Sequence, residues 1–382
     1  EIYMGDWSSD VCSSDLDVQI RARSQRQRRD VAGGDPAGGR GAWRRGGPGG
    51  RSVKLTIRRF EPGDLPAVQR FNQRLEEAGE PHRVFPETPE TQGENAPVTG
   101  RLFLALEEHE LRGSVWLHEQ DFWFGGKNGQ QLRGGFLRLP LSESVVNPVY
   151  RGVPSSLIMQ VLRVQPRLMA LGLGHHDTPF ARLLAAFRWT GTTVPFFFTI
   201  VKPVRVLREL SYGRRDPRRR LAMDLAAFSG LGWLGGQVLN VSRALKLGGF
   251  RSFTAEAEPV YGSWTDELWQ RARSRYDLVP ARDAATLNTL YPRAFYHDFH
   301  RLRVRRDGKD VGMASVLRAD LSSGAEDKYF GQLRVGLLAD AFGEPEEAHG
   351  IVAAATQYLL DTDVDLIVSY MEIGRASCRE RV

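Results

Sequence analysis

Hydrophobic positions in the first half of the chain change between a period of two and the period of a helix. Residues 55–60 (LTIRRF) alternate apolar and polar side chains, which predicts a strand. After a Pro-Gly-Asp turn, apolar side chains recur at residues 65, 68, 71 and 75, the spacing of one helix face. The chain therefore opens with a strand that leads into a helix.

Short apolar runs follow a Pro- and Thr-rich loop at residues 81–100. They predict three or four antiparallel strands, with a hairpin turn at Asn128-Gly129, in the runs 102–106, 113–117, 122–124 and 132–146. The pattern then predicts a helix from Leu157, a strand at 169–173, a helix at 180–189 and a buried apolar strand at 194–201. The predicted order is strand, helix, three or four strands, helix, strand, helix, strand.

The second half repeats this order. Its elements are predicted as a strand at 276–280, a helix at 284–290, a hairpin at 302–317 that turns at Asp307-Gly308, a strand at 333–338, a helix at 345–360 and a strand at 365–369. The sequence predicts an α/β (α+β) chain with two domains, each a mixed and mostly antiparallel sheet flanked by helices. The second domain is expected to be cut short.

Between the halves lies a basic run, with arginines at 214, 215 and 218–220, followed by residues 225–242, which contain no charged side chain. A membrane-spanning helix needs roughly 20 mainly apolar residues. This stretch has 18 residues, four of them glycine. Two interpretations follow: a buried pair of helices between the domains, or an interfacial helix that the arginines anchor at a membrane surface.

Both ends of the chain have an unusual composition. Residues 6–16 and 373–382 back-translate into strings that resemble sequencing adapters, and the strings under residues 12–15 and 373–376 are reverse complements. The two cysteines, Cys12 and Cys378, lie in these segments. The body therefore offers no disulfide, thiolate metal site or cysteine nucleophile, which fits a reducing, cytoplasmic location.

Residues 17–52 are rich in glycine and arginine and lack the apolar periodicity of a core. A non-native or disordered leader is expected over residues 1–52, with residues 17–52 as a translated upstream region or a flexible tail; an RNA-binding arginine tail is the alternative. Of the formal net charge of +6, about +2 remains for residues 53–372 once the two ends are set aside. The basic balance therefore does not indicate a nucleic-acid partner.

The segment with candidate chemistry is residues 146–157, Val-Asn-Pro-Val-Tyr-Arg-Gly-Val-Pro-Ser-Ser-Leu. Together with the element order over residues 53–372, it resembles the GNAT superfamily of acyl-CoA-dependent N-acyltransferases, whose members usually show Val-x-Pro-x-Tyr-Arg-Gly-x-Gly-x-Gly-x-Leu at this place. The resemblance implies that acetyl-CoA or another acyl-CoA binds with its pyrophosphate at the start of the helix. There, backbone N–H groups and the helix dipole favour an anion. The implied cofactor-binding residues are Val146, Arg151, Gly152, Val153, Ser155 and Ser156.

The segment departs from the family pattern at two glycine positions, which are Pro154 and Ser156 here. Pro154 removes one N–H donor but suits the first turn of a helix, and a hydroxyl of Ser155 or Ser156 can compensate. The alternative is an ordinary strand-to-helix turn that binds no ligand.

Acyl transfer to an amine needs a base, and often an acid for the leaving thiolate. Glu143 is the candidate base, with an exposed strand carboxylate as the alternative. The family's acid is a tyrosine four residues before a glycine, and counting back from Gly191 gives Phe187, so that role is unfilled. No third ligand accompanies His175 and His176, and we assign no metal.

In the second half the corresponding turn, residues 340–347, carries two glutamates in the first turn of the helix. Carboxylates there repel a pyrophosphate, so this copy is not expected to bind coenzyme A. We expect a leader at 1–52, an acyl-CoA-binding domain at 53–210, a helical insert at 211–262, a second domain at 263–372 and a tail at 373–382. The predicted activity is acyl transfer to a small-molecule or peptide amine. The alternative is a catalytically inactive scaffold that binds a partner or a membrane surface through residues 214–242.

Overall fold

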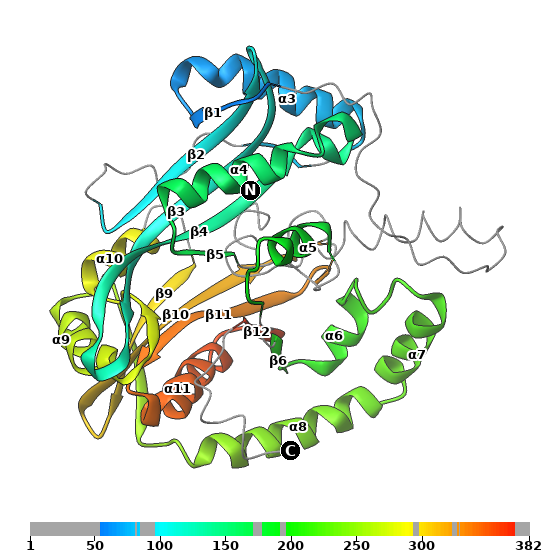
Figure 1. Ribbon diagram of the computed structural model, residues 1–382. Helices are drawn as coiled ribbons and strands as arrows, with labels where there is room; N and C mark the ends of the chain where they lie inside the picture. The colour runs from blue at the N-terminus through cyan, green and yellow to red at the C-terminus, as the bar shows by residue number, and fades with distance from the viewer. Residues whose placement is uncertain are drawn as a thin grey trace, which may run out of the picture. The chain divides into compact units, whose positions relative to one another are not determined.

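The computed structural model describes residues 54–80, 82–84, 96–170, 178–191, 196–292, 298–322, 327 and 329–370, and the predicted leader and tail lie outside them (Figure 1). The chain divides into two compact units. The described part of the first unit lies within residues 54–121 and 132–191, and that of the second within 122–131 and 196–370. These limits differ from the predicted boundary at residue 210, because the tip of one hairpin and a strand after residue 195 belong to the second unit.

The first sheet has the strand order β1 (Thr56–Arg59), β2 (Val98–Glu107), β3 (Glu110–Phe124), β4 (Gln130–Ser142), β5 (Leu168–Ala170). β2 pairs antiparallel with β1 and β3, whereas β4 and β5 are parallel. The helices α3 (Leu65–Glu77), α4 (Val153–Val164) and α5 (Pro179–Ala186) fall at the predicted places in the order. The predicted runs 113–117 and 122–124 are one strand, β3. Gly125 and Gly126 adopt the positive φ of the hairpin, rather than Asn128-Gly129.

Helices cover both faces of this sheet because its strands alternate apolar side chains between the faces. Phe103 and Leu117 pack with α4 and α5, whereas Leu104 and Trp116, on the opposite face, pack with α3. Residues 146–157, the segment with candidate chemistry, lead into α4, which covers one of these faces.

The second sheet has the order β6 (Phe196–Ile200), β12 (Leu366–Tyr370), β11 (Arg334–Gly343), β10 (Lys309–Asp320), β9 (Phe299–Arg306), β7 (Phe253–Glu258). β11 and β12 are parallel and the other pairs are antiparallel. The predicted two-residue turn is confirmed, with positive φ at Asp307 and Gly308. On one face lies α11 (Ala348–Leu360), and on the other α9 (Ser263–Ala272) and α10 (Ala284–Leu290).

The start of the second repeat was predicted wrongly. β7 and α9 hold the places that β1 and α3 hold in the first sheet, so the repeat begins before residue 263 and the insert is not helical throughout. Residues 253–258 (FTAEAE) do alternate apolar and polar side chains, and that signal was missed. The strand expected at 276–280 is β8 (Leu278–Pro280), which pairs with Phe122–Phe124 of β3 inside the second unit.

The apolar strand predicted at residues 194–201 exists as β6, but it is not buried. It lies at the edge of the second sheet, antiparallel to β12, and Phe198 is 61% exposed. Residue type alone does not distinguish an edge strand from a central one.

Three helices lie between β6 and β7: α6 (Pro203–Glu209), and, within the predicted insert, α7 (Pro217–Phe228) and α8 (Leu231–Gly248) (Figure 1). The predicted helical pair is present, but its predicted burial is wrong: Phe228 is 72% exposed and Trp233 is 62% exposed. Within the described residues, no helix combines the length and apolar character needed to cross a bilayer.

Candidate functional site

The first repeat changes from strand to helix through two short 3-10 helices, η3 (Glu143–Val145) and η4 (Pro148–Tyr150). Leu139, near the end of β4, has a φ of 45°. The side chain of Ser142 accepts a hydrogen bond from the Ser144 N–H, and that of Asn147 accepts one from the Val149 N–H. Such short-range bonds favour turns over continued strand or helix. The local sequence therefore fixes where α4 begins.

Glu143 lies in a network of charges beneath this turn. Its side chain is 8% exposed and accepts hydrogen bonds from Arg112 at 2.9 Å and from Arg74 at 3.3 Å. Arg112 also donates to Glu107 at 3.0 Å, and the Tyr150 hydroxyl donates to the same carboxylate at 2.9 Å. Burial, together with the hydrogen bond to Glu107, raises the pKa of Tyr150. The network ties both ends of the turn to β2 and β3.

The start of α4 is open. Gly152 is its N-cap and no side chain caps the first turn. A Cβ placed on Gly152 would meet no atom within 4 Å. Because the first N–H groups of a helix have no acceptor within the helix, they are available to an anion that approaches along this side.

The other predicted cofactor-binding residues lie around this opening, with different side-chain environments. Val153 is 1% exposed and packs in the core, so its side chain does not face a ligand. The Ser156 hydroxyl donates to the Gly152 carbonyl at 3.0 Å, and its oxygen can still accept. Ser155 is half-buried and Arg151 is exposed. Val146 is 36% exposed and lies in the preceding turn, between η3 and η4.

The position of the family's acid, Phe187, directly follows α5 and packs on the core beneath α4. Residues 175–177, with the two histidines, lie outside the described residues. Among the residues that the structure describes, no group of three or more His, Cys, Asp or Glu side chains is placed to hold a metal ion.

The corresponding turn of the second repeat carries three ion pairs. Glu344, the N-cap of η6 (Pro345–Glu347), pairs with Arg271 at 2.7 Å. Glu346 pairs with Arg275, and Glu347 pairs with Arg306 at 3.0 Å. Each carboxylate of this turn is thus paired with an arginine, and the three pairs occupy the entry to the helix.

The two turns share a framework that the sequence did not reveal. Arg74 donates to the carbonyl of Leu111 at 2.7 Å, and Arg271 donates to the carbonyl of Asp310 at 2.7 Å. Each arginine also pairs with the glutamate that follows the fourth strand of its sheet, Glu143 or Glu344. The pair was missed because the first helix of the second repeat was assigned to residues 284–290 instead of α9.

A glycine allows each turn to approach its sheet. A Cβ on Gly113 would lie 2.7 Å from Val153 Cγ1, and one on Gly312 would lie 2.3 Å from Ile351 Cδ1. Both distances are shorter than side chains tolerate, so the close approach of α4 and of α11 requires glycine on the facing strand.

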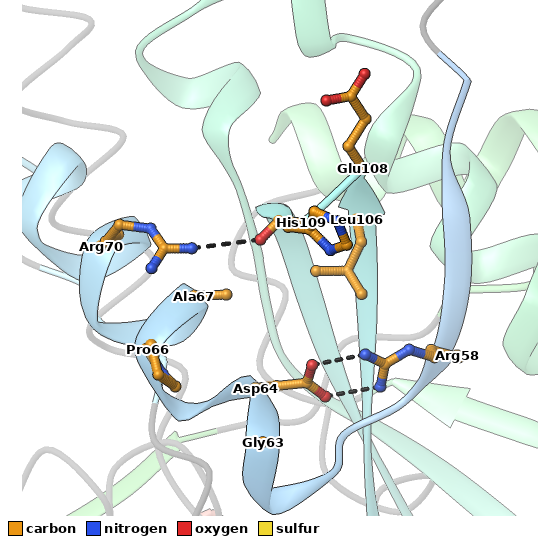
Figure 2. Close-up of a pocket in the computed structure, with 9 residues that line it drawn as sticks. All are labelled: Arg58, Gly63, Asp64, Pro66, Ala67, Arg70, Leu106, Glu108 and His109. Carbon is orange, nitrogen blue, oxygen red and sulfur yellow. Dashed lines mark hydrogen bonds and ion pairs between the residues drawn. The ribbon is translucent and has the colours of Figure 1, made fainter.

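A separate pocket of about 150 Å³ lies between α3 and the β2–β3 turn (Figure 2). Several of its charged groups are paired: Asp64 binds Arg58 at 2.6 Å, and Arg70 binds Glu110 at 2.9 Å, whereas Glu108 also lines the pocket. The hydrogen bond from Arg58 lowers the pKa of Asp64. Ligand pockets are usually about 300–1,000 Å³. This pocket is too small for coenzyme A.

No protein-family model matches the chain, and no curated protein matches it. Among solved structures it is similar to Eis1 from Mycobacterium abscessus (14% identity, TM-score 0.39, 82% of this chain and 65% of that chain). It is similar to a GCN5-related N-acetyltransferase from Anabaena variabilis (10%, 0.45, 82% and 65%). It is also similar to a tandem GNAT protein from the clavulanic acid biosynthesis pathway (13%, 0.40, 82% and 89%). The chain thus spans 65% of the length of the first two.

The strand order of the two sheets, the single parallel pair that each half contributes and the order of the helices agree with the tandem GNAT-like fold predicted from the sequence. The predicted fold class is therefore confirmed.

Proposed function

We propose that the first unit is an acyl-CoA-dependent N-acyltransferase, which holds acetyl-CoA or another acyl-CoA at the start of α4 and transfers the acyl group to a small-molecule or peptide amine. The observation that supports this is the first turn of α4: it has no side-chain cap, it is open at Gly152, and no carboxylate occurs from Ser144 to Val164.

The pyrophosphate would bind the backbone N–H groups of Val153 and Ser155, with the helix dipole as a second attraction. Pro154, between them, has no N–H to offer. The exposed side chain of Arg151 adds a positive charge beside the opening. In the reaction the amine nitrogen attacks the thioester carbonyl, the C–S bond breaks, and the thiolate of coenzyme A leaves and takes up a proton.

We assign Glu143 a positioning role. A general base needs a free oxygen to take a proton from the ammonium group, but both carboxylate oxygens of Glu143 accept hydrogen bonds from guanidinium groups. Its charge balances Arg74 and Arg112, and through them it holds η3 and η4 against the sheet. The base role predicted from the sequence therefore has no support in this geometry.

Titration calorimetry of the full chain tests the proposal. Coenzyme A should bind, whereas pantetheine, which lacks the pyrophosphate, should bind at least about tenfold more weakly, a loss of about 1.4 kcal/mol. Equal affinities for coenzyme A and pantetheine would show that the first turn of α4 does not bind the pyrophosphate. A chain that binds no coenzyme A at millimolar concentration would be the inactive scaffold.

A further inference from the structure

Helices α7 and α8 expose apolar side chains to solvent, with the Arg208 guanidinium 4.5 Å from the centroid of one of them, the Phe228 ring. On α7, Leu221, Leu225 and Phe228 recur at helical spacing and are 63%, 63% and 72% exposed. On α8, Leu234, Val238, Val241 and Leu245 recur at the same spacing and are 54%, 69%, 61% and 76% exposed. We call these seven residues the exposed stripe. Contiguous exposed apolar side chains of this kind mark a surface that binds something.

The packing of α8 explains why its bulky side chains point outward. Its buried side consists of small residues: a Cβ on Gly232 would lie 3.1 Å from Val204 Cγ2, and one on Gly236 would lie 3.6 Å from Pro203 Cγ. These glycines let α8 lie close to α6. Leu234 and Val238 each follow one of them by two residues, about 200° around the helix, which is nearly the opposite side.

The same segment is strongly basic, whereas residues 53–372 as a whole have a net charge of about +2. Residues 203–249 contain nine basic and three acidic residues, a net charge of +6, and the whole chain also sums to +6. All other residues together therefore sum to zero. Arg218, Arg219 and Arg220 are exposed in the first turn of α7, just before Leu221. Of the nearby acids, Asp224 binds Arg214 at 2.6 Å and Asp216 caps α7.

We propose that α7 and α8 dock on the surface of an anionic lipid bilayer, with the exposed stripe in the boundary between headgroups and acyl chains and Arg218–Arg220 against the lipid phosphates. A helix with an apolar face and a basic end lies in the plane of such an interface. Trp233, at 62% exposure, is of the type enriched at this depth. The proposal does not depend on the proposed enzymatic function.

Charge distinguishes a bilayer from a second copy of the chain. A twofold contact through the exposed stripe would bring two segments of charge +6 together, and like charges oppose that contact. An anionic membrane surface attracts the same arginines. The charges therefore favour lipid as the occupant.

Vesicle sedimentation of the full chain tests this directly. The protein should bind vesicles of equimolar phosphatidylcholine and phosphatidylserine, and bind pure phosphatidylcholine far more weakly. Changing Arg218, Arg219 and Arg220 to glutamine should weaken binding about a hundredfold, because each basic residue near the surface contributes roughly fivefold. The matched control changes three exposed arginines of the first unit, Arg163, Arg167 and Arg182, and should leave binding unchanged.

A second experiment reports on the apolar contact. Brominated lipid should quench the fluorescence of the bound protein, and Trp233→Phe should remove most of that quenching. Leu225→Gln with Val238→Gln should weaken binding to anionic vesicles without lowering the melting temperature, because both side chains are exposed. A destabilised double variant would show that the stripe packs within the fold.

Three outcomes would overturn the proposal. One is the absence of binding to either vesicle, and another is equal loss of binding in the arginine variant and its control. The third is a lipid-free dimer, seen by ultracentrifugation, that the Leu225→Gln and Val238→Gln changes convert to monomer, because the stripe would then be covered by a second copy.

Discussion

The helix-entry turns of the two repeats share one framework and differ in charge. In both, an arginine from the first helix binds a backbone carbonyl of the central hairpin and the glutamate after the fourth strand. The first turn has no carboxylate beyond Glu143 until α4 ends, whereas the second carries Glu346 and Glu347 in addition to Glu344. The shared framework positions the helix after each turn, and the charges that differ are the reason why the proposed function assigns the anionic ligand to the first turn.

The common glutamate also has a different environment in each repeat. Glu143 is 8% exposed between two arginines, whereas Glu344 is 31% exposed and binds one arginine that is itself half-exposed. A buried charge pair depends on both partners, since removing one leaves the other desolvated. The same position is therefore structurally essential in one repeat and peripheral in the other.

The largest expected effect comes from neutralising these glutamates. Glu143→Gln should lower the free energy of unfolding by about 3 kcal/mol, because the charge-assisted hydrogen bonds from Arg74 and Arg112 to this carboxylate are weakened, although Glu110 and Glu107 still pair with the two arginines. Glu344→Gln removes a surface pair and should cost less than about 1 kcal/mol. Urea denaturation measures both. Equal losses would show that burial does not distinguish the two turns.

A smaller effect is expected from adding a methyl group beneath each helix. Gly113→Ala and Gly312→Ala should each lower the free energy of unfolding by about 2 kcal/mol through overpacking. Only Gly113→Ala should also weaken coenzyme A binding, because it displaces Val153 at the start of α4. Calorimetric titration of the two variants provides the test, and a matching loss of affinity in Gly312→Ala would contradict the assignment of the ligand to the first unit.

The next substitution is expected to change the affinity for coenzyme A without changing stability. Gly152→Val should weaken coenzyme A binding by about tenfold, or about 1.4 kcal/mol, because the side chain would occupy the space that the phosphates approach. Stability should hardly change, since that space is empty and the φ of Gly152 is −79°. Gly63→Val, at another open glycine of the same unit, is the control. Glu344→Gln combined with Glu347→Gln should leave the affinity as it is.

The smallest effect is expected on the pH dependence of the free energy of unfolding, tested with one aspartate in each repeat. The hydrogen bond from Arg58 lowers the pKa of Asp64, and that from Arg303 lowers the pKa of Asp310. A carboxylate with a lowered folded-state pKa contributes stability above the unfolded value, about 3.9, and loses it as the pH falls below that value. Asp64→Asn and Asp310→Asn should each cost about 1 kcal/mol at neutral pH and less at pH 3. Unfolding curves at the two pH values measure this, and a constant difference would refute it.

Local patterns predicted most of the elements. The hairpin at Asp307-Gly308 and the helix at 284–290 carry their signals within a few residues, and both are confirmed. The residues around β6 could not show to which sheet this strand belongs, because β12, the strand that pairs with it, is far away in the sequence. The alternation in β7 covers only six residues. The predicted insert was extended over it to residue 262, so the start of the second repeat was placed too far toward the C-terminus.

The sequence predicted which segment forms the candidate site, but the burial and the surroundings of its residues could be seen only in the structure. The order of residues 151–156 shows where an anion could bind, but not that the space beside Gly152 is open or that Val153 is buried. The partners of Glu143 come from α3 and β3, so no pattern near residue 143 could reveal them. The environment of a carboxylate is a tertiary property.

The pairing of β6 with β12 has a consequence for synthesis on the ribosome. β6 follows directly on the first repeat, yet its only described strand partner spans Leu366–Tyr370, so β6 leaves the exit tunnel long before that partner is made. During this interval Phe196, Phe197 and Phe198 lack the strand that pairs with them in the folded chain, and exposed apolar segments of this kind can recruit other chains. Translation speed over the second repeat and access of chaperones to this strand therefore bear on the yield of native protein.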